Sequence, residues 1–344
     1  MAIDMHAHWV PRRLMSESKA GRDWYGWRIL QDGAGREYAS LGQHMLLFSA
    51  SQGTLDDPMG RAKRREAEDS ITFEALMLTG LFWNYHLPED AAVRACREVN
   101  EEVAEVQKAY PDRYCGMALL PMQHQKAAMA ELEYAASKLN LRTIAIASNV
   151  RNLNLDEPSV LPVIEQAAKM GLSICVHPTI WEKAADARLP RYSFVNSFGA
   201  PLESSIAAMS LVYSGFFDRH PDARVMFTQG GGWIHFGVGR LDQRYTTRPD
   251  GHPMKHRPAE YLRHMYFDCL VHDDDSLGLL AKRAGTDRIM LGTDFPASGG
   301  ILGGAVNWIK KFGSFSEEDK DRILLRNAER FLNLKIPGQM ARSA

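Results

Sequence analysis

The chain contains few cysteines, no long apolar run and almost no net charge. Its four cysteines are widely spaced over 344 residues, so neither a disulfide framework nor a cysteine-based zinc cluster is expected. No apolar stretch approaches the roughly 20 residues that cross a bilayer, so we expect no membrane partner. The formal net charge of −1 argues against nucleic acid binding. Since no basic segment with an apolar core opens the chain, a cytoplasmic location is expected.

Glycine-rich nucleotide loops are also missing, because no Gly-x-Gly-x-x-Gly fingerprint follows the first apolar run. What is present is an alternation of apolar, strand-like runs with helical patterns. The eight strand-like runs are 3–8, 73–78, 114–121, 143–148, 172–178, 224–230, 265–271 and 288–296. Helical spacing fits 89–110, 124–139, 158–170, 202–220, 275–284 and 317–333. This alternation predicts an α/β fold, a (β/α)8 TIM barrel forming one domain over 1–336, with a loose tail at 337–344.

Two segments depart from this alternation. Residues 9–55 are too many for a barrel loop, and two semi-alternating runs in them flank a glycine-rich turn at 32–35. They predict a small β-hairpin insertion after the first strand, lying over the barrel mouth. Residues 61–69 are rich in charge, which we interpret as the solvated face of a helix rather than as a phosphate site.

Four polar residues at strand ends form the strongest functional signal. His6 and His8 are two residues apart in the first predicted strand, and side chains at this spacing point to the same side of a strand. His177 and Asp294 each end an apolar run and are each followed by a proline within two residues. Taken singly, each is typical of a strand that runs into a turn. Together, at the ends of strands, they predict a metal site.

The motifs around these residues resemble the amidohydrolase-2 branch of the amidohydrolase superfamily, close to the aminocarboxymuconate-semialdehyde decarboxylase group. The resemblance rests on motifs in the order of the family: Asp4-Met-His-Ala-His8, Val176-His177-Pro178, Gly230-Gly-Gly232, Asp268-Cys-Leu-Val-His272-Asp273 and Leu291-Gly-Thr-Asp294. It implies one divalent ion, usually zinc with Mn²⁺ or Fe²⁺ as alternatives, held by His6, His8, His177 and Asp294. It further implies a homodimer and a metal-dependent decarboxylase, a carbon–carbon lyase, acting on a small aromatic or unsaturated carboxylic acid. Asp294 would then be the proton donor.

Gln229 is the main departure from that resemblance, since related decarboxylases carry a histidine before the three glycines. Glutamine can orient a water or a carboxylate but cannot act as a general base. The catalytic candidates are therefore Asp294, Gln229 and His272, with His235 as a substitute base or, alternatively, a helix-surface or supporting histidine. Two alternatives stay open: hydrolysis or hydration by a metal-bound hydroxide, and a catalytically silent homologue.

The substrate pocket can be outlined by residue type. Aromatic residues fall in segments expected near the barrel mouth and favour a flat substrate, although about half of them would only fill the core. They are Trp9, Trp24, Trp27, Phe82, Trp83, Tyr85 and Phe194. The resemblance implies that Arg240 binds the substrate carboxylate across a dimer interface. The second arginine of the family has no match, and His44 stands in its region. The substrate-binding candidates are thus Arg240, Trp83, Phe194 and His44.

Overall fold

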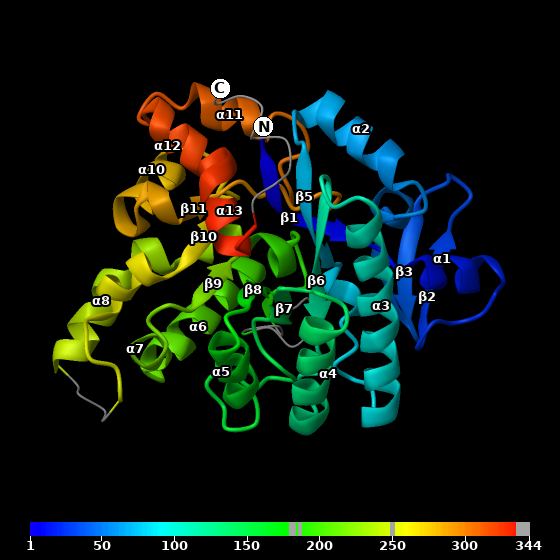
Figure 1. The fold of residues 1–344 in the computed structure, drawn as a ribbon, viewed down its shortest axis with the longest axis horizontal. Coiled ribbons are helices and arrows are strands. Elements are labelled where there is room, and N and C mark those ends of the chain that lie inside the picture. The colour runs from blue at the N-terminus through cyan, green and yellow to red at the C-terminus, as the bar shows by residue number, and fades with distance from the viewer. Residues whose placement is uncertain (179–183, 185–187, 248–251, 335–344) are drawn as a thin grey trace.

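The fold is a parallel barrel, as predicted. The computed structural model describes residues 1–178, 184, 188–247 and 252–334, so the predicted tail at 337–344 lies outside the described residues. Neighbouring strands follow one another in chain order: β1 (Ile3–Trp9), β5 (Phe73–Leu78), β6 (Tyr114–Leu119), β7 (Thr143–Ala147), β8 (Ser173–His177), β9 (Arg224–Phe227), β10 (Tyr266–Asp268) and β11 (Ile289–Met290). Because the strands are parallel, their C-terminal ends open at one mouth. Helices surround the strands on the outside (Figure 1).

The helices agree with most of the predicted ranges. Those after the second strand are α3 (Glu89–Ala109), α4 (Gln125–Ser137), α5 (Leu161–Lys169), α6 (Ala200–Tyr213), α7 (Phe216–Arg219), α8 (Ile234–Thr247), α9 (Pro258–Tyr261), α10 (Asp274–Ala284), α11 (Ala305–Lys311), α12 (Glu317–Asp321) and α13 (Asn327–Leu332). The predicted helix 202–220 divides into α6 and α7 because Gly215 between them has a φ of 70°. Among the helices described, none is long and apolar enough to span a bilayer.

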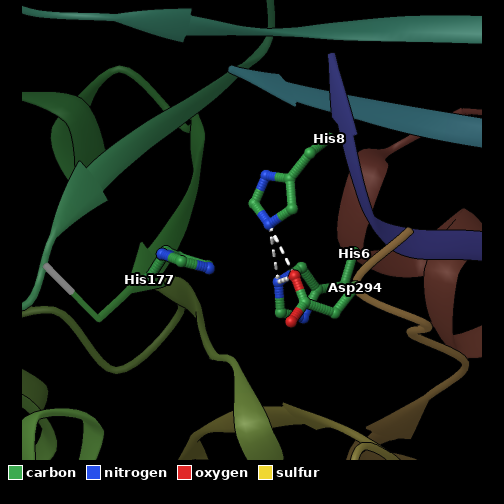
Figure 2. Close-up of side chains that lie close together, drawn as sticks. All are labelled: His6, His8, His177 and Asp294. Atoms are coloured by element: carbon green, nitrogen blue, oxygen red, sulfur yellow. Dashed lines mark hydrogen bonds and ion pairs between the residues drawn. The ribbon is translucent and has the colours of Figure 1, made fainter. Parts of the chain in front are cut away.

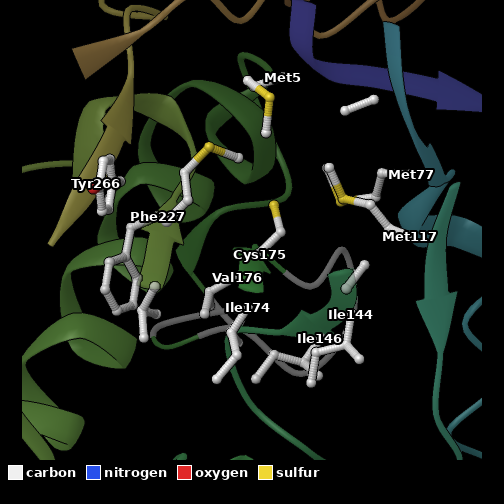
Figure 3. Packing of buried hydrophobic residues seen from close by; sticks show 14 of the residues in the cluster. Met5, Met77, Met117, Ile144, Ile146, Ile174, Cys175, Val176, Phe227 and Tyr266 are labelled. Atoms are coloured by element: carbon white, nitrogen blue, oxygen red, sulfur yellow. The ribbon is translucent and has the colours of Figure 1, made fainter. Parts of the chain in front are cut away.

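The core lies around the strands, which are buried along nearly their whole length. Strands of a parallel barrel are covered on both faces, so their sequences are apolar almost without interruption. Figure 3 shows this packing, with branched, sulfur-containing and aromatic side chains from β1 to β10 gathered together, among them Met5, Met77, Ile144, Ile174 and Phe227. All four cysteines are buried in the reduced state.

The last strand is much shorter than the predicted run 288–296. Only Ile289 and Met290 pair with β10. Beyond them the chain runs beside β1 through three backbone hydrogen bonds: Met5 N to Leu291 O (2.9 Å), Asp294 N to His6 O (2.7 Å) and His8 N to Phe295 O (2.7 Å). Asp294 has a φ of 61°, which interrupts a regular ladder. We call this junction between β1 and residues 291–296 the seam of the barrel.

The insertion contains more than the predicted hairpin. It begins with α1 (Arg12–Lys19) and continues as a three-stranded antiparallel sheet of β2 (Trp27–Gln31), β3 (Glu37–Leu41) and β4 (His44–Leu47). The third strand escaped prediction because all four of its residues are exposed, so the alternation typical of a half-buried strand is missing. Two buried indoles anchor the insertion: Trp27 Nε1 donates to Asn84 Oδ1 (2.9 Å) and Trp24 Nε1 donates to Glu98 Oε1 (2.8 Å).

The charge-rich segment 61–69 forms a helix, α2 (Pro58–Asp69). It has the predicted solvated face, formed by Lys63, Arg64, Glu66 and Glu68, but it also has a buried charged face that was not predicted. Arg61 and Arg65 are 2% and 1% exposed, and Asp69 is also buried. Buried charges need partners, and these come from the first residues of neighbouring strands. Arg61 binds Glu74 of β5, and Arg65 binds Asp4 of β1.

Candidate metal centre

The four predicted metal ligands meet at the barrel mouth. His6 and His8 come from β1, His177 ends β8, and Asp294 belongs to the seam. One ligand atom from each residue lies within 4.8 Å of all the others, and the four residues are buried. His8 Nε2 lies 2.8 Å from Asp294 Oδ1 and 3.2 Å from His6 Nε2. Figure 2 shows this close group, with the ring of His177 facing it from the opposite side.

Hydrogen bonds at the far ring nitrogens set the orientation of two imidazoles. His6 Nδ1 donates to Asp268 Oδ2 (2.7 Å), and His177 Nδ1 donates to the carbonyl of Pro178 (2.8 Å). In both residues this directs Nε2 into the cluster, where it can bind a metal ion that takes the place of a proton. The three rings meet edge to face, with centroids 4.9–5.1 Å apart.

The charge state of the cluster follows from its burial and its carboxylates. Burial disfavours charged His6, but the Asp294 and Asp268 carboxylates outweigh this and raise the pKa of His6 to about 10. Burial, followed by the nearby His8 and His6, holds the pKa of His177 well below its usual range. Burial opposes the ionised form of Asp294, yet His6 and His8 overcome it and hold its pKa well below the ordinary value. Without a metal, the cluster therefore contains an ionised Asp294 carboxylate next to a protonated His6 and a neutral His177.

Three nitrogens and one carboxylate oxygen form a donor set that fits one divalent ion. A cation replaces the proton that His6 carries and balances the Asp294 carboxylate. Zinc binds imidazole nitrogens and carboxylate oxygens and can take a fifth ligand, so these four side chains would still allow a substrate oxygen to bind it. Mn²⁺ and Fe²⁺ accept the same mixture of imidazole and carboxylate. The residues that the sequence predicted as metal ligands are thus the ones that the fold brings together.

Gln229 and His235 flank the glycine loop at the end of β9. Gln229 has a φ of 57°, and its Oε1 is buried without a partner among the described residues. The next residue, Gly230, donates its N–H to Asp268 Oδ1 (2.7 Å), so one carboxylate holds both this loop and His6. His235 Nε2 donates to Gly230 O (2.8 Å) and is 5% exposed. The helix-surface interpretation of His235 was therefore wrong, and a supporting position is what the geometry favours.

The predicted substrate residues are distributed differently. Trp83 is buried and its ring centroid lies 5.9 Å from that of His177, next to the cluster. His44, Phe194, Arg240 and His272 are exposed, outside the buried ligand group. Several other aromatic residues fill the core between the insertion and the barrel: Trp24, Trp27 and Phe82 pack edge to face.

Asp268 supports the cluster through hydrogen bonds that the sequence alone did not reveal. It is fully buried, and its two oxygens hold His6 Nδ1 and the N–H groups of Gly230 and Leu270. A signal was present, since Asp268 ends an apolar strand in the same way as His177 and Asp294 do. Its partner could not be identified, because His6 lies 262 residues earlier in the chain.

Comparison with known proteins agrees with this geometry. The family model described as amidohydrolase matches residues 3–334. The chain is 31% identical to 2-amino-3-carboxymuconate-6-semialdehyde decarboxylase of Dictyostelium discoideum, over 97% of this chain and 92% of that protein.

Solved structures share the fold. The crystal structure of 5-carboxyvanillate decarboxylase from Sphingomonas paucimobilis matches with a TM-score of 0.80 at 22% identity, covering 97% of this chain and 99% of that one. A dihydroxybenzoic acid decarboxylase from Polaromonas sp. JS666, with bound manganese and the inhibitor 2-nitroresorcinol, matches with a TM-score of 0.77 at 19% identity, covering 97% of each chain. With the family model and a 31% identical relative both spanning nearly its whole length, the chain belongs to the amidohydrolase family.

Proposed function

We propose that this protein is a metal-dependent decarboxylase that releases carbon dioxide from a small aromatic or unsaturated carboxylic acid. The observation that carries the proposal is the convergence of His6, His8, His177 and Asp294 at the barrel mouth. Membership of the amidohydrolase family and the decarboxylase activity of its named relatives support the reaction class. Zinc is the ion that we expect, with Mn²⁺ and Fe²⁺ as alternatives.

The ion, when bound, would supply the positive charge that holds a carboxylate or neighbouring hydroxyl oxygen of the substrate. Side chains of the protein beside the ion would position the rest of the substrate. Trp83 beside His177 offers a flat apolar face against which an aromatic ring can pack. Gln229, with a buried oxygen that has no partner among the described residues, is suited to orient the substrate by a hydrogen bond.

Asp294 is the proton donor in this proposal. Decarboxylation breaks the bond between a ring or alkene carbon and the carboxyl carbon, and the first carbon must then receive a proton. The lowered pKa of Asp294 makes it a carboxylate in the free site. The substrate carboxylate has no proton to give near neutral pH. Asp294 would therefore take a proton from a hydroxyl group of the substrate, whose acidity the bound ion would raise, and pass it to the carbon that keeps the electron pair of the broken bond when carbon dioxide departs.

A second copy of the chain is the partner that we propose for the exposed face of α8. Trp233 and Phe236 are 45% and 86% exposed, and Phe198 packs on Trp233 with ring centroids 5.5 Å apart. Monomers rarely leave such large apolar side chains together in water. Arg240 follows Phe236 by one helical turn and so lies on the same side of α8. In the homodimer, Arg240 would reach the substrate carboxylate bound by the other protomer.

A cytoplasmic location is part of the proposal. The four cysteines are buried and free, which suits a compartment that keeps thiols reduced.

The decisive experiment measures turnover of the metal-loaded protein with hydroxybenzoates and carboxylated ring-cleavage products. We expect carbon dioxide release in a stoichiometric ratio to the decarboxylated product. The Asp294→Asn variant should lose turnover, since an amide can neither donate the proton nor balance the metal charge. A matched panel of amides and lactones tests the alternative, because hydrolysis of these without carbon dioxide release would contradict the proposal. Loss of bound metal in His177→Ala would tie the activity to the cluster.

A further inference from the structure

A buried arginine on α2 contacts both sides of the barrel seam next to the metal ligands. Arg65 Nη2 donates to Asp4 Oδ2 (2.8 Å) and to Thr293 Oγ1 (3.0 Å). Its guanidinium also lies over the ring of Phe295, 4.2 Å from the centroid. Asp4 precedes His6 by two residues, while Thr293 and Phe295 flank Asp294 on either side. One cation thus contacts the neighbours of metal ligands on both halves of the seam.

Asp4 connects Arg65 to the backbone on both sides of the seam. Its Oδ1 accepts the N–H of His6 (3.0 Å) and the N–H of Thr293 (3.1 Å). Its Oδ2 accepts the hydroxyl of Thr293 (2.5 Å) and binds Arg65. Asp4, Arg65 and Thr293 are each at most 1% exposed. A buried carboxylate in this position is stable only while its counter-charge is present, so the bridge depends on Arg65.

The seam needs such a bridge because regular pairing is weak there. β11 has two residues, and the isolated bridge between Ala7 and Phe295 takes the place of a continuous ladder beside β1. Asp294 itself has the left-handed backbone conformation that non-glycine residues adopt only when their surroundings impose it. Of the proposed metal ligands, His6 and His8 lie on the β1 side of the seam, and Asp294 lies on the side formed by residues 291–296.

We infer that Arg65 is a positioning residue for the metal centre: through Asp4 and Thr293 it holds His6 and His8 in register with Asp294. The inference rests on the metal site proposed above and extends it to residues that touch neither metal nor substrate. Polar groups that orient metal ligands typically contribute 10–100-fold to metal affinity.

Arg61 provides a matched control on the same helix. It is also buried, and it pairs with Glu74 through Nε and Nη2, each at 3.0 Å. Its other contacts are the Gly53 carbonyl and a more distant approach to Phe295, 5.1 Å from the ring centroid. The two arginines share Glu74, because Arg65 Nε also donates to its Oε1 (3.3 Å). Removal of Arg61 deletes a buried cation but no hydrogen bond of Asp4 or Thr293, and it leaves Arg65 as a counter-charge for Glu74.

The test measures the Zn²⁺ affinity of folded metal-free protein by competition with a chromophoric chelator. We expect Arg65→Met to bind Zn²⁺ about 10–100-fold more weakly than wild type, and Arg61→Met to stay within about threefold. Thr293→Val should weaken binding in the same direction, whereas Thr293→Ser, which keeps the hydroxyl, should not. The visible spectrum of the Co²⁺-loaded proteins gives a second readout, and a changed ligand geometry should appear in Arg65→Met and Thr293→Val alone.

The outcomes separate this inference from the proposed function. If wild-type protein binds Zn²⁺ while Arg65→Met and Thr293→Val bind it equally well, the inference is overturned and the metal centre stands. If wild-type protein binds no metal, the proposed metal centre fails, and the inference fails with it. Should Arg65→Met not fold, the comparison of Thr293→Val with Thr293→Ser decides.

Discussion

Three proposed catalytic residues share an unusual backbone conformation. Gln229, His272 and Asp294 have φ values of 57°, 65° and 61°, and each follows the C-terminal end of a barrel strand. For residues other than glycine this conformation costs on the order of 1–3 kcal/mol, and it persists where the surrounding structure imposes it. Such strain clusters at functional sites, because it turns a side chain out of the direction that a regular strand would give it. For His272, the catalytic role remains a prediction.

Substitutions of Gln229 test the role of this side chain. If Gln229 only orients the substrate, Gln229→Ala should lower kcat/KM by about two- to tenfold, since a neutral hydrogen bond contributes roughly 0.5–1.5 kcal/mol. Gln229→His should be unchanged or slower. Gln107→Ala is the control: Gln107 binds Gly116 N and Asn140 O away from the site, so its loss should leave kcat/KM unchanged.

A faster Gln229→His variant would count against the proposed mechanism. If it also gained a pH dependence near 6–7, a titratable partner for a metal-bound hydroxide would be the better explanation, and hydrolysis would become the favoured reaction.

Helix α8 presents two different faces. Ile234, His235 and Val238 are buried against the barrel, whereas Phe236 and Arg240 are exposed, as is Trp233 directly before the helix. The buried face supports the glycine loop through His235, and the exposed face is the one that we assign to the second protomer. A single helix would thus link the loop of its own site to the substrate pocket of its partner.

Hybrid dimers test this assignment. Arg240→Ala and Asp294→Ala should each be nearly inactive alone, because every site then lacks one required residue. In an equal mixture with free exchange, half of the dimers are hybrids with one intact site, so about a quarter of wild-type activity should return. Activity assays before and after mixing measure the rescue. Absence of rescue, with subunit exchange demonstrated by labelled chains, would argue against a shared site.

At the scale of the whole molecule, one buried histidine should make folding stability depend on pH. His235 packs on Phe267 with ring centroids 4.8 Å apart, and burial lowers its pKa to about 4. The unfolded chain binds a proton at a pKa of about 6.5. Protons therefore bind the unfolded state preferentially between these values, so stability decreases as pH falls from about 6.5 to about 4.

The expected loss is about 3 kcal/mol of unfolding free energy across this range, measured by urea denaturation in the presence of a chelator. His235→Gln keeps an N–H donor for Gly230 but cannot titrate, so the difference between wild type and variant should grow at higher pH and shrink near pH 4. His256→Gln replaces an exposed histidine and should follow the wild-type curve. Parallel curves for wild type and His235→Gln would contradict the assigned pKa.

Both the barrel and the proposed metal ligands could be predicted from the order of residues along the chain. Eight apolar runs separated by helices indicate a closed parallel sheet, and parallel strands bring their C-terminal ends to one mouth. A polar residue directly after such a run must therefore lie near the others, whatever the details of packing. For this reason His6, His8, His177 and Asp294 could be predicted together from their positions in the chain.

The charged residues that support these ligands could not be predicted in the same way, because their partners lie far away in the chain. Asp268 binds His6, and Arg65 binds Asp4, across large separations in the chain. The helical segment containing Arg61 and Arg65 appears solvated in the sequence because charged residues are normally exposed. Their burial depends on carboxylates that other strands place opposite them, and no local pattern records such a pairing. Local periodicity fixes the direction of a side chain, whereas the partner that permits a charge to be buried is fixed only when distant segments pack.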